Sequence, residues 1–398
     1  MNQNKKICVI GLGYIGLPTA ALLANRGYNV HGVDVVQSTV DTINQGKIHI
    51  VEPELDTFVQ SAVNSGKLKA SLLPDVADVF IIAVPTPFHE GYVPNVDYVV
   101  SATKAISPYV KDGDIVILES TSPVGTTELV EETLIAENVD TNKLYISHCP
   151  ERVLPGHIMR ELVENDRIVG GLTPEATAKT VEFYETFVSG AVLSTDARTA
   201  EMAKLTENSF RDTNIAFANE LSMLCDKFDI NVWELISLAN RHPRVNILQP
   251  GAGVGGHCIA VDPWFIVHAG GEMAKMIRTA REVNTYKTEW AIEKIKNAAL
   301  KFESENGRKA KVACMGLSFK PDIDDLRESP ALYIARRLKA DGLKILAVEP
   351  NIVSHKEFEI VEYKEAIKEA DIVTFLVAHK EFKKLDIKTD LNFCGVNR

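Results

Sequence analysis

The sequence predicts an α/β protein in which two Rossmann-like parallel-sheet domains are joined by a long helical central region. Short apolar segments alternate with helix-length segments at the start of the chain, and the same alternation returns after residue 310. The part between them has a helical pattern. A chain of 398 residues is too long for one compact core. We therefore expect domains at 1–194, 195–300 and 301–398.

Each element is expected where an apolar run meets turn residues. The expected strands are Lys6–Ile10, Asn29–Asp34, Asp78–Val84, Asp114–Leu118, Lys143–Ser147, Lys311–Met315, Lys344–Val348 and Asp371–Val377. The expected helices are Leu17–Arg26, about Thr195–Phe228, Val232–Ala239, about Lys275–Leu300 and Ala331–Lys339, with a charged break at Glu303–Arg308.

The composition is that of a soluble globular protein, with 45% hydrophobic and 24% charged residues. A net charge of −11 argues against nucleic acid or an anionic membrane as partner, although it permits a small anionic ligand. The six cysteines form no C-x-x-C pair, which favours a reduced, cytoplasmic compartment and no metal site. No run is long enough to span a membrane, and the first residues lead directly into a strand, so we expect no signal peptide.

A glycine fingerprint follows the first expected strand. Gly11, Gly13 and Gly16 have the G-x-G-x-x-G spacing, and Asp34 ends the next strand 18 residues after Gly16. The first glycine permits a tight turn, the second lets the backbone approach a pyrophosphate, and the third allows close packing of helix on strand. The helix N-terminus favours phosphate, and the acid favours the ribose diol of NAD while repelling the 2′-phosphate of NADP. This context predicts an NAD-binding domain.

Three polar residues lie just past the carboxyl ends of expected strands, where ligands bind in parallel sheets. They are Thr86 between two prolines, Thr121 in Ser-Thr-Ser-Pro, and Glu151 in Pro-Glu-Arg. Each has a structural alternative. Thr86 and Thr121 could serve as helix caps or turn residues, and Glu151 could form a surface ion pair.

The central helix carries Lys204 and Asn208 at positions i and i+4, which share one helix face. The alternative is a solvated polar face. Asp212, Asn219 and Glu220 are also polar along this helix, which is otherwise apolar. A long apolar helix between two domains is also a natural dimerisation element.

A second glycine-rich stretch places four glycines within residues 251–256, shortly before Cys258. Dense glycine marks a backbone that approaches another group closely, and a thiolate is a strong nucleophile. The alternative is a flexible turn beside a small buried cysteine. In the last third, Lys320 and Arg327 follow a strand end, where they could hold a phosphate or sugar hydroxyl, or pair with Asp324 and Asp325.

Together these motifs resemble the UDP-glucose/GDP-mannose dehydrogenase family over nearly the whole chain. The resemblance rests on the motifs in their order rather than on any one of them. They are Gly11–Gly16, Ser120–Gly125, Pro150-Glu151, the Lys204/Asn208 helix, Gly255–Cys258, and Phe319-Lys320 through Arg327. It implies an NAD-dependent enzyme whose third domain binds a UDP-sugar and whose subunits form a homodimer or a higher homo-oligomer.

The reaction implied by the resemblance is a four-electron oxidation of a sugar C6 alcohol to an acid, with two NAD reduced. Cys258 would form a thiohemiacetal and then a thioester, which water hydrolyses. Lys204 and Asn208 would stabilise the oxyanion, Asp262, Thr121 and a water would assist proton transfer, and Glu151 would support hydrolysis.

The resemblance also implies binding contacts. Arg241 or Arg244 would reach the sugar nucleotide from the same or a neighbouring subunit, and Arg327 would contact the cofactor pyrophosphate. Cofactor contacts are implied for Gly11, Gly13, Tyr14, Ile15, Gly16, Asp34, Pro85, Thr86, Thr121 and Arg327. Substrate contacts are implied for Glu151, Arg152, Val153, Lys204, Asn208, Arg211, Arg241, His242, Arg244, Gly255, His257, Phe319 and Lys320.

The residues after Cys258 bear on the substrate. Ile259-Ala260-Val261-Asp262 stands where UDP-glucose and GDP-mannose enzymes carry Leu-Pro-Lys-Asp. With residues 242–251, this resembles the family branch that oxidises UDP-N-acetylmannosamine for surface polysaccharide synthesis. The alternatives are UDP-N-acetylglucosamine or UDP-glucose as substrate, a two-electron hydroxyacid dehydrogenase that uses Lys204 and Asn208, and a non-enzymatic NAD-binding sensor.

Overall fold

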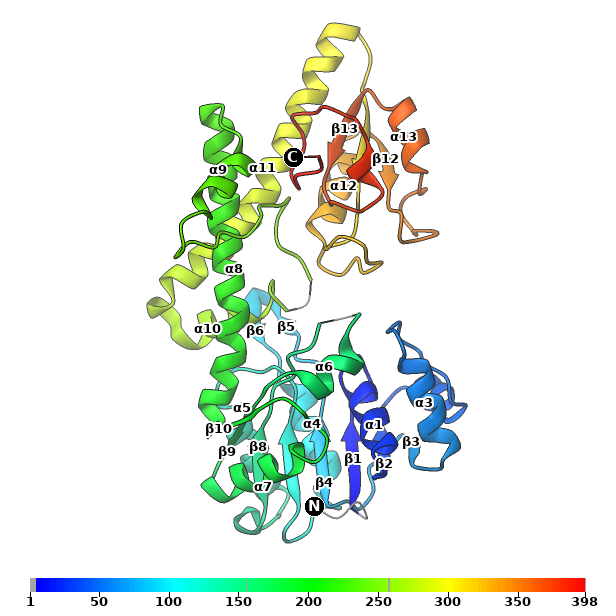
Figure 1. The fold of residues 1–398 in the computed structure, drawn as a ribbon, viewed down its shortest axis with the longest axis vertical. Coiled ribbons are helices and arrows are strands. Elements are labelled where there is room, and N and C mark those ends of the chain that lie inside the picture. The colour runs from blue at the N-terminus through cyan, green and yellow to red at the C-terminus, as the bar shows by residue number, and fades with distance from the viewer. Residues whose placement is uncertain (1–4, 155, 257, 398) are drawn as a thin grey trace. The chain divides into compact units, whose positions relative to one another are not determined.

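The computed structural model describes residues 5–154, 156–256 and 258–397. The chain divides into two compact units, of which the first ends at Thr206 and the second begins at Glu207. The division falls within the long helix α8 (Ala197–Phe228). The two units are described separately below (Figure 1).

The first unit is built on an eight-stranded sheet with the order β10-β9-β8-β7-β4-β1-β2-β3. The strands from β3 to β8 are parallel, which confirms the prediction of a Rossmann-like sheet. The strands are β1 (Lys6–Ile10), β2 (Asn29–Val33), β3 (Leu68–Ser71), β4 (Val79–Ile82), β7 (Ile115–Leu118), β8 (Tyr145–His148), β9 (Arg167–Gly171) and β10 (Val192–Asp196). A small hairpin, β5 (Phe88–His89) and β6 (Val93–Pro94), lies outside this sheet.

One edge of the sheet differs from the prediction. Strand β9 pairs with β8 in the antiparallel direction, and β10 then follows β9 in parallel. Neither strand was predicted, because β9 contains two glycines and β10 is half-exposed, so both lack a strong apolar run.

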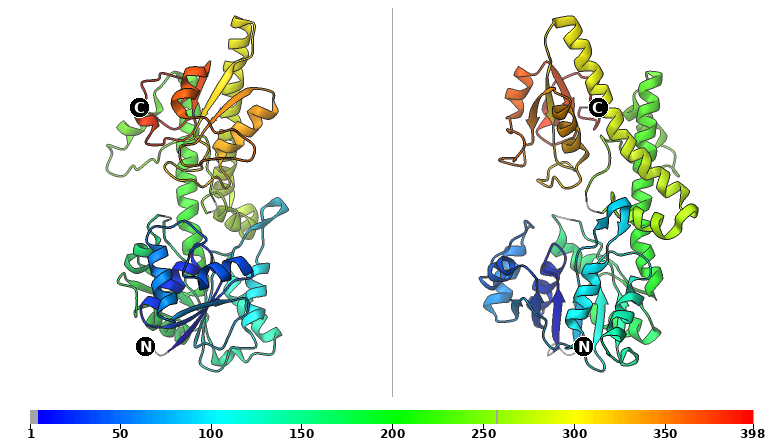
Figure 2. Two further views of the ribbon diagram at one scale, coloured as in Figure 1. Left: turned by 90° about the vertical axis from the view of Figure 1, so that its right-hand side faces the viewer. Right: turned by 180° about the vertical axis from the view of Figure 1, so that it is seen from behind.

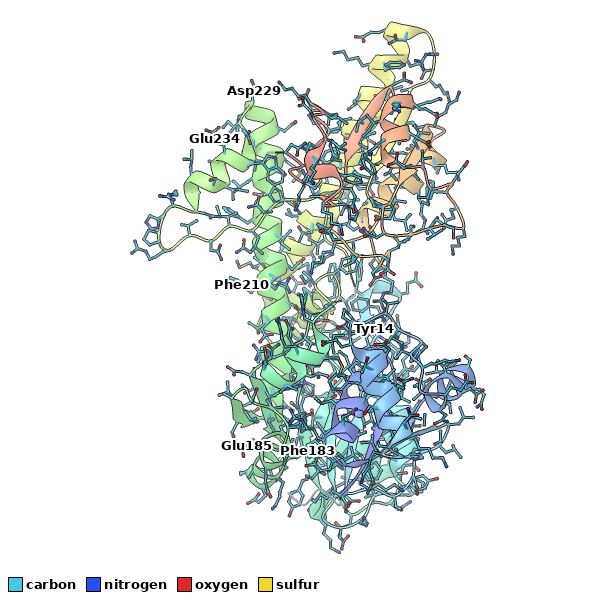
Figure 3. The ribbon with its side chains drawn as sticks, turned by 45° about the vertical axis from the view of Figure 1, so that its right-hand side comes forward. Tyr14, Phe183, Glu185, Phe210, Asp229 and Glu234 are labelled. Atoms are coloured by element: carbon cyan, nitrogen blue, oxygen red, sulfur yellow. The ribbon has the colours of Figure 1, made fainter. Side chains whose placement is uncertain are left out.

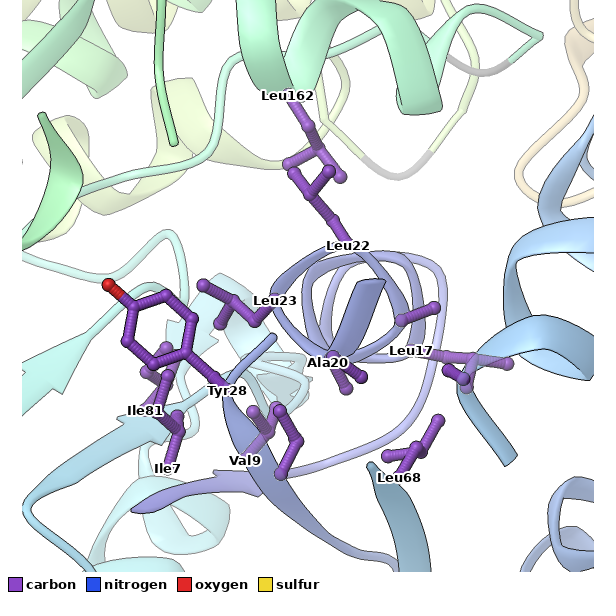
Figure 4. Packing of buried hydrophobic residues seen from close by; sticks show 14 of the residues in the cluster. Ile7, Val9, Leu17, Ala20, Leu22, Leu23, Tyr28, Leu68, Ile81 and Leu162 are labelled. Atoms are coloured by element: carbon purple, nitrogen blue, oxygen red, sulfur yellow. The ribbon is translucent and has the colours of Figure 1, made fainter. Parts of the chain in front are cut away.

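Helices cover the faces of this sheet because its strands are apolar on both sides. Figure 4 shows Leu17, Ala20 and Leu23 of α1 among residues of the sheet, with Leu22 directed toward Leu162 of α6. The helices of this unit are α1 (Gly16–Asn25), α2 (Gln37–Asn44), α3 (Leu55–Asn64), α4 (Asp97–Ile106), α5 (Thr126–Ala136), α6 (Ile158–Glu164), α7 (Pro174–Tyr184) and the start of α8.

The second unit combines long helices with a smaller parallel sheet of order β12-β11-β13, which confirms the second α/β region (Figures 1 and 2). Its strands are β11 (Lys311–Met315), β12 (Lys344–Val348) and β13 (Ile372–Phe375). Its helices are the rest of α8, α9 (Val232–Ala239), α10 (Asp262–Gly270), α11 (Lys275–Asn306), α12 (Pro330–Ala340) and α13 (Tyr363–Glu369).

Helix α11 runs further than predicted. We expected it to end near Leu300, before a break at Glu303–Arg308, but the helix continues to Asn306. Residues 301–306 contain neither glycine nor proline, so charge alone does not interrupt the helix. It ends where Gly307 adopts a left-handed conformation with φ of 66°.

Among the described residues, none of the helices combines the length and the hydrophobicity that crossing a bilayer requires.

Candidate functional site

The turn between β1 and α1 has the form that the glycine fingerprint predicts. Gly11 has φ of 91°, and a methyl group there would lie 2.4 Å from the carbonyl oxygen of Ala83. A methyl group at Gly16 would lie 1.8 Å from the Gly11 carbonyl oxygen. Gly13, in contrast, has nothing within 4 Å of that position. Two glycines are therefore required for packing, and the third keeps the backbone open to an incoming group.

Asp34 follows β2 and holds this turn in place. Its carboxylate accepts hydrogen bonds from the backbone N–H of Leu12 at 3.1 Å and of Val36 at 2.9 Å. The side chain is half-buried, so its carboxylate is also accessible to a ligand. An open backbone at Gly13 beside an acid after β2 fits the pyrophosphate and ribose of NAD. Tyr14 is exposed and Ile15 half-buried at the start of α1, next to that turn.

The different environments of the glycines lead to a testable contrast. We expect Gly16→Ala to destabilise the protein strongly, because the added methyl group overlaps the backbone of Gly11. Gly13→Ala should fold normally and weaken NAD binding by about tenfold, because the methyl group occupies only the open approach. Thermal unfolding and calorimetric titration with NAD measure both effects. Equal unfolding temperatures for the two variants would contradict this account.

The loops after β4 and β7 are joined by hydrogen bonds. The Thr86 hydroxyl donates to the Thr121 carbonyl at 2.5 Å, so two predicted site residues lie together. The Ser120 hydroxyl accepts from the Val84 N–H at 2.9 Å and donates to the Val84 carbonyl at 2.8 Å. Pro85 is exposed beside them. These hydrogen bonds hold the two loops together at this edge of the sheet.

Glu201 of α8 fixes the other end of the Thr121 loop. Its carboxylate accepts from the N–H of Gly125 at 2.7 Å, and from the N–H and hydroxyl of Thr127 at 2.8 and 2.6 Å. These groups form the N-terminus of α5, which a carboxylate stabilises. Lys204 lies one turn further along α8 and is half-buried. Glu201 thus connects the helix that carries Lys204 to the loop that carries Thr121, a link that the sequence analysis missed.

Glu151 forms a buried ion pair with Arg167, with 2.5 Å between Oε2 and Nη1. The alternative of a surface pair is wrong, because both side chains are at most 5% exposed. The register explains the contact. Ser147 pairs with Gly171 and His148 with Gly170, so continuing the antiparallel pairing sets residue 151 opposite residue 167. The neighbouring Arg152 and Val153 are half-buried, and the Arg152 guanidinium donates to the Asp166 carbonyl at 3.1 Å.

A second carboxyl group belongs to the same cluster. Glu119 follows β7, is 2% exposed, and accepts a hydrogen bond from the Tyr184 hydroxyl at 2.7 Å. Burial, with the nearby charge of Glu151, raises the pKa of Glu119 to about 7. Burial also raises the pKa of Cys149 to about 12, so that thiol is neutral. The sequence alone does not single out Glu119, although its place directly after a strand is a usable signal.

In the second unit, two predicted catalytic residues are in contact. The Asn208 amide donates to Asp262 Oδ2 at 2.5 Å, and both side chains are buried. Asp262 begins α10, and its backbone N–H donates to the Cys258 carbonyl at 2.8 Å. This contact places the Asn208 and Asp262 side chains next to the turn that carries Cys258.

Cys258 is the exposed cysteine of the chain, while Cys394 is half-buried and Cys8, Cys149, Cys225 and Cys314 are buried. The alternative of a small buried cysteine is therefore wrong. His257, a predicted substrate contact, lies outside the described residues.

Close packing requires three of the four glycines before Cys258. A methyl group at Gly255 would lie 2.4 Å from the Glu328 carbonyl oxygen, and one at Gly256 would lie 2.9 Å from the Phe319 ring. Gly253 has φ of 143°, and its methyl group would lie 2.2 Å from the Thr288 hydroxyl. The stretch is thus packed against the segment that carries Phe319, which is also a predicted substrate contact.

A buried polar network holds the start of this stretch. Asn219 of α8 accepts from the Gly251 N–H at 2.9 Å and donates to Asn284 of α11 at 2.8 Å. Asn284 donates to Asp212 at 2.8 Å, and Asp212 forms a 2.6 Å ion pair with Arg281. In the sequence, Asp212 and Asn219 are only polar positions on a helix, because their partners are about 30 to 70 residues away.

Other predicted substrate residues of this unit lie on its surface. Arg211 on α8, Lys320 after β11, and Arg241, His242 and Arg244 after α9 are all exposed. The guanidinium of Arg327 pairs with Asp325 at 2.7 Å, as the alternative for that residue predicted. The structure therefore brings Asn208, Asp262 and the turn that carries Cys258 together.

The loop after β11, which leads to Phe319 and Lys320, is fixed by a buried acid that the sequence analysis missed. Glu349 after β12 accepts from the N–H groups of Leu317 and Ser318 at 2.8 and 2.9 Å. It also accepts from His379 at 3.0 Å, since the other ring nitrogen of His379 accepts from the Asp322 N–H at 3.0 Å. These hydrogen bonds and the nearby His379 lower the pKa of Glu349 to about 2, against the opposing effect of burial.

Comparison with known proteins gives three successive matches that cover most of the chain. Models of the UDP-glucose/GDP-mannose dehydrogenase family match as NAD binding domain over residues 5–188, central domain over 198–286 and UDP binding domain over 313–393. The chain belongs to this family. The resemblance seen in the sequence motifs is thereby confirmed, together with the NAD-dependent nucleotide-sugar dehydrogenase class and the NAD cofactor.

Individual proteins of this family are similar to the chain over almost their full length. A UDP-N-acetyl-D-mannosamine dehydrogenase of Campylobacter jejuni is 57% identical, covering 99% of this chain and 100% of the relative. An NDP-N-acetyl-D-galactosaminuronic acid dehydrogenase of Ralstonia nicotianae is 55% identical, covering 96% and 92%. The solved UDP-N-acetyl-mannosamine dehydrogenase Cap5O of Staphylococcus aureus is 42% identical with a TM-score of 0.84, covering 96% and 90%.

Membership of the family bears on the alternatives from the sequence. A match to a UDP binding domain over residues 313–393 favours a nucleotide-sugar dehydrogenase. A two-electron hydroxyacid dehydrogenase does not require a UDP binding domain. Membership of this enzyme family also favours an enzyme over a non-enzymatic NAD sensor.

Proposed function

We propose that this chain oxidises the C6 alcohol of UDP-N-acetylmannosamine to the corresponding uronic acid. The observation that carries the proposal is the exposed thiol of Cys258 after a tightly packed glycine stretch, on a turn that leads to Asp262, the hydrogen-bond partner of Asn208. Such a thiol is suited to covalent catalysis of an aldehyde-to-acid oxidation. The product would serve the synthesis of surface polysaccharide.

NAD supplies a hydride acceptor, and converting a primary alcohol to an acid requires two hydride equivalents. The residues that would hold NAD are those around the open backbone at Gly13, with Asp34 at the ribose and Thr86 and Thr121 at the neighbouring strand ends. Tyr14, Ile15, Pro85 and Arg327 complete the proposed set.

The chain's own residues have distinct proposed roles. The Cys258 thiolate adds to the C6 carbonyl of the aldehyde to give a thiohemiacetal, whose oxidation leaves a thioester on sulfur. Lys204 and the Asn208 amide stabilise the oxyanion, and Asp262, Thr121 and a water accept or return the proton. Water then attacks the thioester with Glu151 as base, the C–S bond breaks, and the uronate and the thiolate are released.

The substrate assignment is supported by similarity. The C. jejuni relative, which is 57% identical, acts on UDP-N-acetyl-D-mannosamine by its name. The R. nicotianae relative, at 55%, is named for an N-acetylgalactosaminuronic acid, so an N-acetylated hexosamine is common to both. Ala260-Val261 in place of Pro-Lys after the cysteine argues against UDP-glucose. Arg152, Val153, Arg211, Arg241, His242, Arg244, Gly255, His257, Phe319 and Lys320 are the proposed substrate contacts, with Glu151, Lys204 and Asn208.

The test is a substrate panel with the purified protein. UDP-N-acetylmannosamine, UDP-N-acetylglucosamine, UDP-N-acetylgalactosamine and UDP-glucose are each supplied with NAD, and both NADH and acid are measured. We expect two NADH per acid and the highest kcat/KM with UDP-N-acetylmannosamine. A preference for UDP-glucose would refute the assignment, and one NADH per substrate would refute the thioester route.

We also propose a homodimer or a higher homo-oligomer that uses an apolar stripe on α8. Phe210, Phe217 and Leu224 are spaced by seven residues and are 67%, 52% and 42% exposed (Figure 3 labels Phe210). Phe228 extends the stripe at 61%. Residues at this spacing share one helix face, and large apolar side chains in a row favour association. The location proposed for the enzyme is the cytoplasm, where its exposed thiol stays reduced.

The stripe leads to a prediction about assembly. We expect Phe217→Asp to convert the oligomer to monomers at micromolar concentration, because it buries a charge at the centre of the contact. Analytical ultracentrifugation measures the change. Met273→Asp, which alters a 90% exposed residue outside α8, is the matched control and should assemble as the wild type does. A dimeric Phe217→Asp protein would contradict the proposed interface.

The division into domains at 1–194, 195–300 and 301–398 is kept as a proposal. The family models, which match over 5–188, 198–286 and 313–393, support it.

A further inference from the structure

The cluster around Glu151 contains a second buried carboxyl group to which the proposed chemistry assigns no task. Glu119 follows β7, Glu151 follows β8, Arg167 opens β9 and Tyr184 ends α7. Three adjacent strands and one helix thus bring two acids, one guanidinium and one phenol into the interior of the first unit. All four side chains are at most 6% exposed.

The hydrogen bonds of the cluster are unequal. Glu151 is fully engaged, because Oε2 pairs with Arg167 at 2.5 Å and Oε1 accepts from the Arg152 N–H at 2.6 Å. Glu119 accepts only from Tyr184, and its Oε2 has no hydrogen-bond partner among the described residues. Burying an ionised carboxylate that has an oxygen without a donor costs free energy, and burying the neutral acid costs less.

The charge of the cluster therefore depends on Glu119. The groups that face it are Glu151, Arg167, Tyr184 and Cys149. Burial raises the pKa of Cys149 to about 12 and that of Tyr184 well above its usual value, so both are neutral near pH 7. Arg167 and Glu151 balance each other. The cluster is neutral when Glu119 is protonated and carries one negative charge when Glu119 is ionised.

We propose that Glu119 is a positioning residue that acts through Glu151, and that its ionisation makes Glu151 a stronger base during thioester hydrolysis. When Glu151 takes a proton from the attacking water, its negative charge is neutralised. A second negative charge on Glu119 favours that step, because it repels the ionised form of Glu151 more than the protonated form. A protonated Glu119 offers no such assistance. This role rests on the proposed function of Glu151.

The expected pH dependence follows from the pKa of Glu119, which burial raises to about 7. Hydrolysis of the thioester should accelerate as the pH rises through this value and then level off. Glu119→Gln imitates the neutral acid and keeps the acceptor for Tyr184. We expect it to match the wild type at pH 6 and to hydrolyse the thioester about fivefold more slowly at pH 8.5.

The experiment measures the decay of the covalent sugar–enzyme adduct by rapid quench from pH 6 to 9, in the wild type and Glu119→Gln. Tyr184→Phe is a second variant, and it should shift the midpoint upward because it removes the hydrogen bond that favours ionised Glu119. Glu185→Gln, at an exposed neighbour of Tyr184 labelled in Figure 3, is the control and should keep the wild-type profile.

Infrared spectroscopy provides a readout that is independent of turnover. The carbonyl band of a protonated carboxyl group should be present at pH 6, vanish by pH 9, and be absent from Glu119→Gln throughout. A band that does not titrate, or an identical pH profile in Glu119→Gln and the wild type, would overturn the role of Glu119 alone. Failure to oxidise any nucleotide sugar would overturn the proposed function and this role with it, even if the band titrates.

Discussion

Cys258→Ser should reduce uronate formation by at least about a thousandfold, because serine at neutral pH does not replace a thiolate as nucleophile. Net formation of acid requires an adduct at C6 that can lose the second hydride. The variant should fold normally, since the side chain is exposed and serine is close to cysteine in size. We expect the sugar nucleotide to accumulate at the aldehyde level, as measured by mass spectrometry and by the ratio of NADH to acid.

The matched control is Cys394→Ser, because Cys394 is the half-buried cysteine and burial raises its pKa to about 12. It should retain two NADH per acid. Alkylation with iodoacetamide at pH 8 should modify Cys258 first, because burial also raises the pKa of Cys8, Cys149 and Cys314 to about 12. Acid formation by Cys258→Ser at the wild-type rate would refute the thioester route.

Asp212→Ala should destabilise the second unit by about 3–5 kcal/mol, since it leaves the Arg281 guanidinium buried without its counter-charge. Asp212 is fully buried, Arg281 is 6% exposed, and they are 2.6 Å apart between α8 and α11. The loss also removes the side-chain acceptor of the Asn284 amide and leaves only the Asp212 carbonyl, and Asn284 in turn positions Asn219, which accepts from the Gly251 N–H. We therefore expect a lower kcat from the fraction that folds. Denaturant unfolding measures the stability change.

Asp226→Ala is the matched control, because Asp226 pairs with Lys294 across the same two helices at 2.5 Å. That pair is almost 40% exposed, so its loss should change the free energy of unfolding by about 1 kcal/mol or less. The double variant Asp212→Ala/Arg281→Met should recover part of the lost stability, because no unpaired charge stays buried. Equal effects of Asp212→Ala and Asp226→Ala would show that burial does not determine the strength of the Asp212–Arg281 interaction.

Local sequence was sufficient for the features that depend on neighbouring residues. The turn at Gly11, Gly13 and Gly16 was predicted because glycine spacing, flanking strand and helix all lie within one short segment. The exposed Cys258 was singled out by the density of glycine before it. At Gly11, Gly16, Gly255 and Gly256 the structure supplies the reason for glycine, which is a backbone or ring atom within 3 Å of the missing side chain.

The contacts that complete the candidate site depend on pairing between distant segments. Asn208 and Asp262 are 54 residues apart, and Asp212 and Arg281 are 69 apart. No local signal selects one partner among many polar residues at such separations. Glu151 illustrates the difficulty, because the sequence left it between a surface ion pair and a site residue.

The sequence alone determined the α/β architecture, the NAD fingerprint and the choice of Cys258 as candidate nucleophile. Glycine spacing and apolar periodicity depend only on residues that are close together in the chain. Only the tertiary structure decided which acids are buried and which groups they pair with. The antiparallel register of β8 and β9 sets Arg167 opposite Glu151, and the adjacent end of β7 adds Glu119 to the same buried cluster. Burial and charge then control the ionisation of these groups, and both arise only when distant strands pack together.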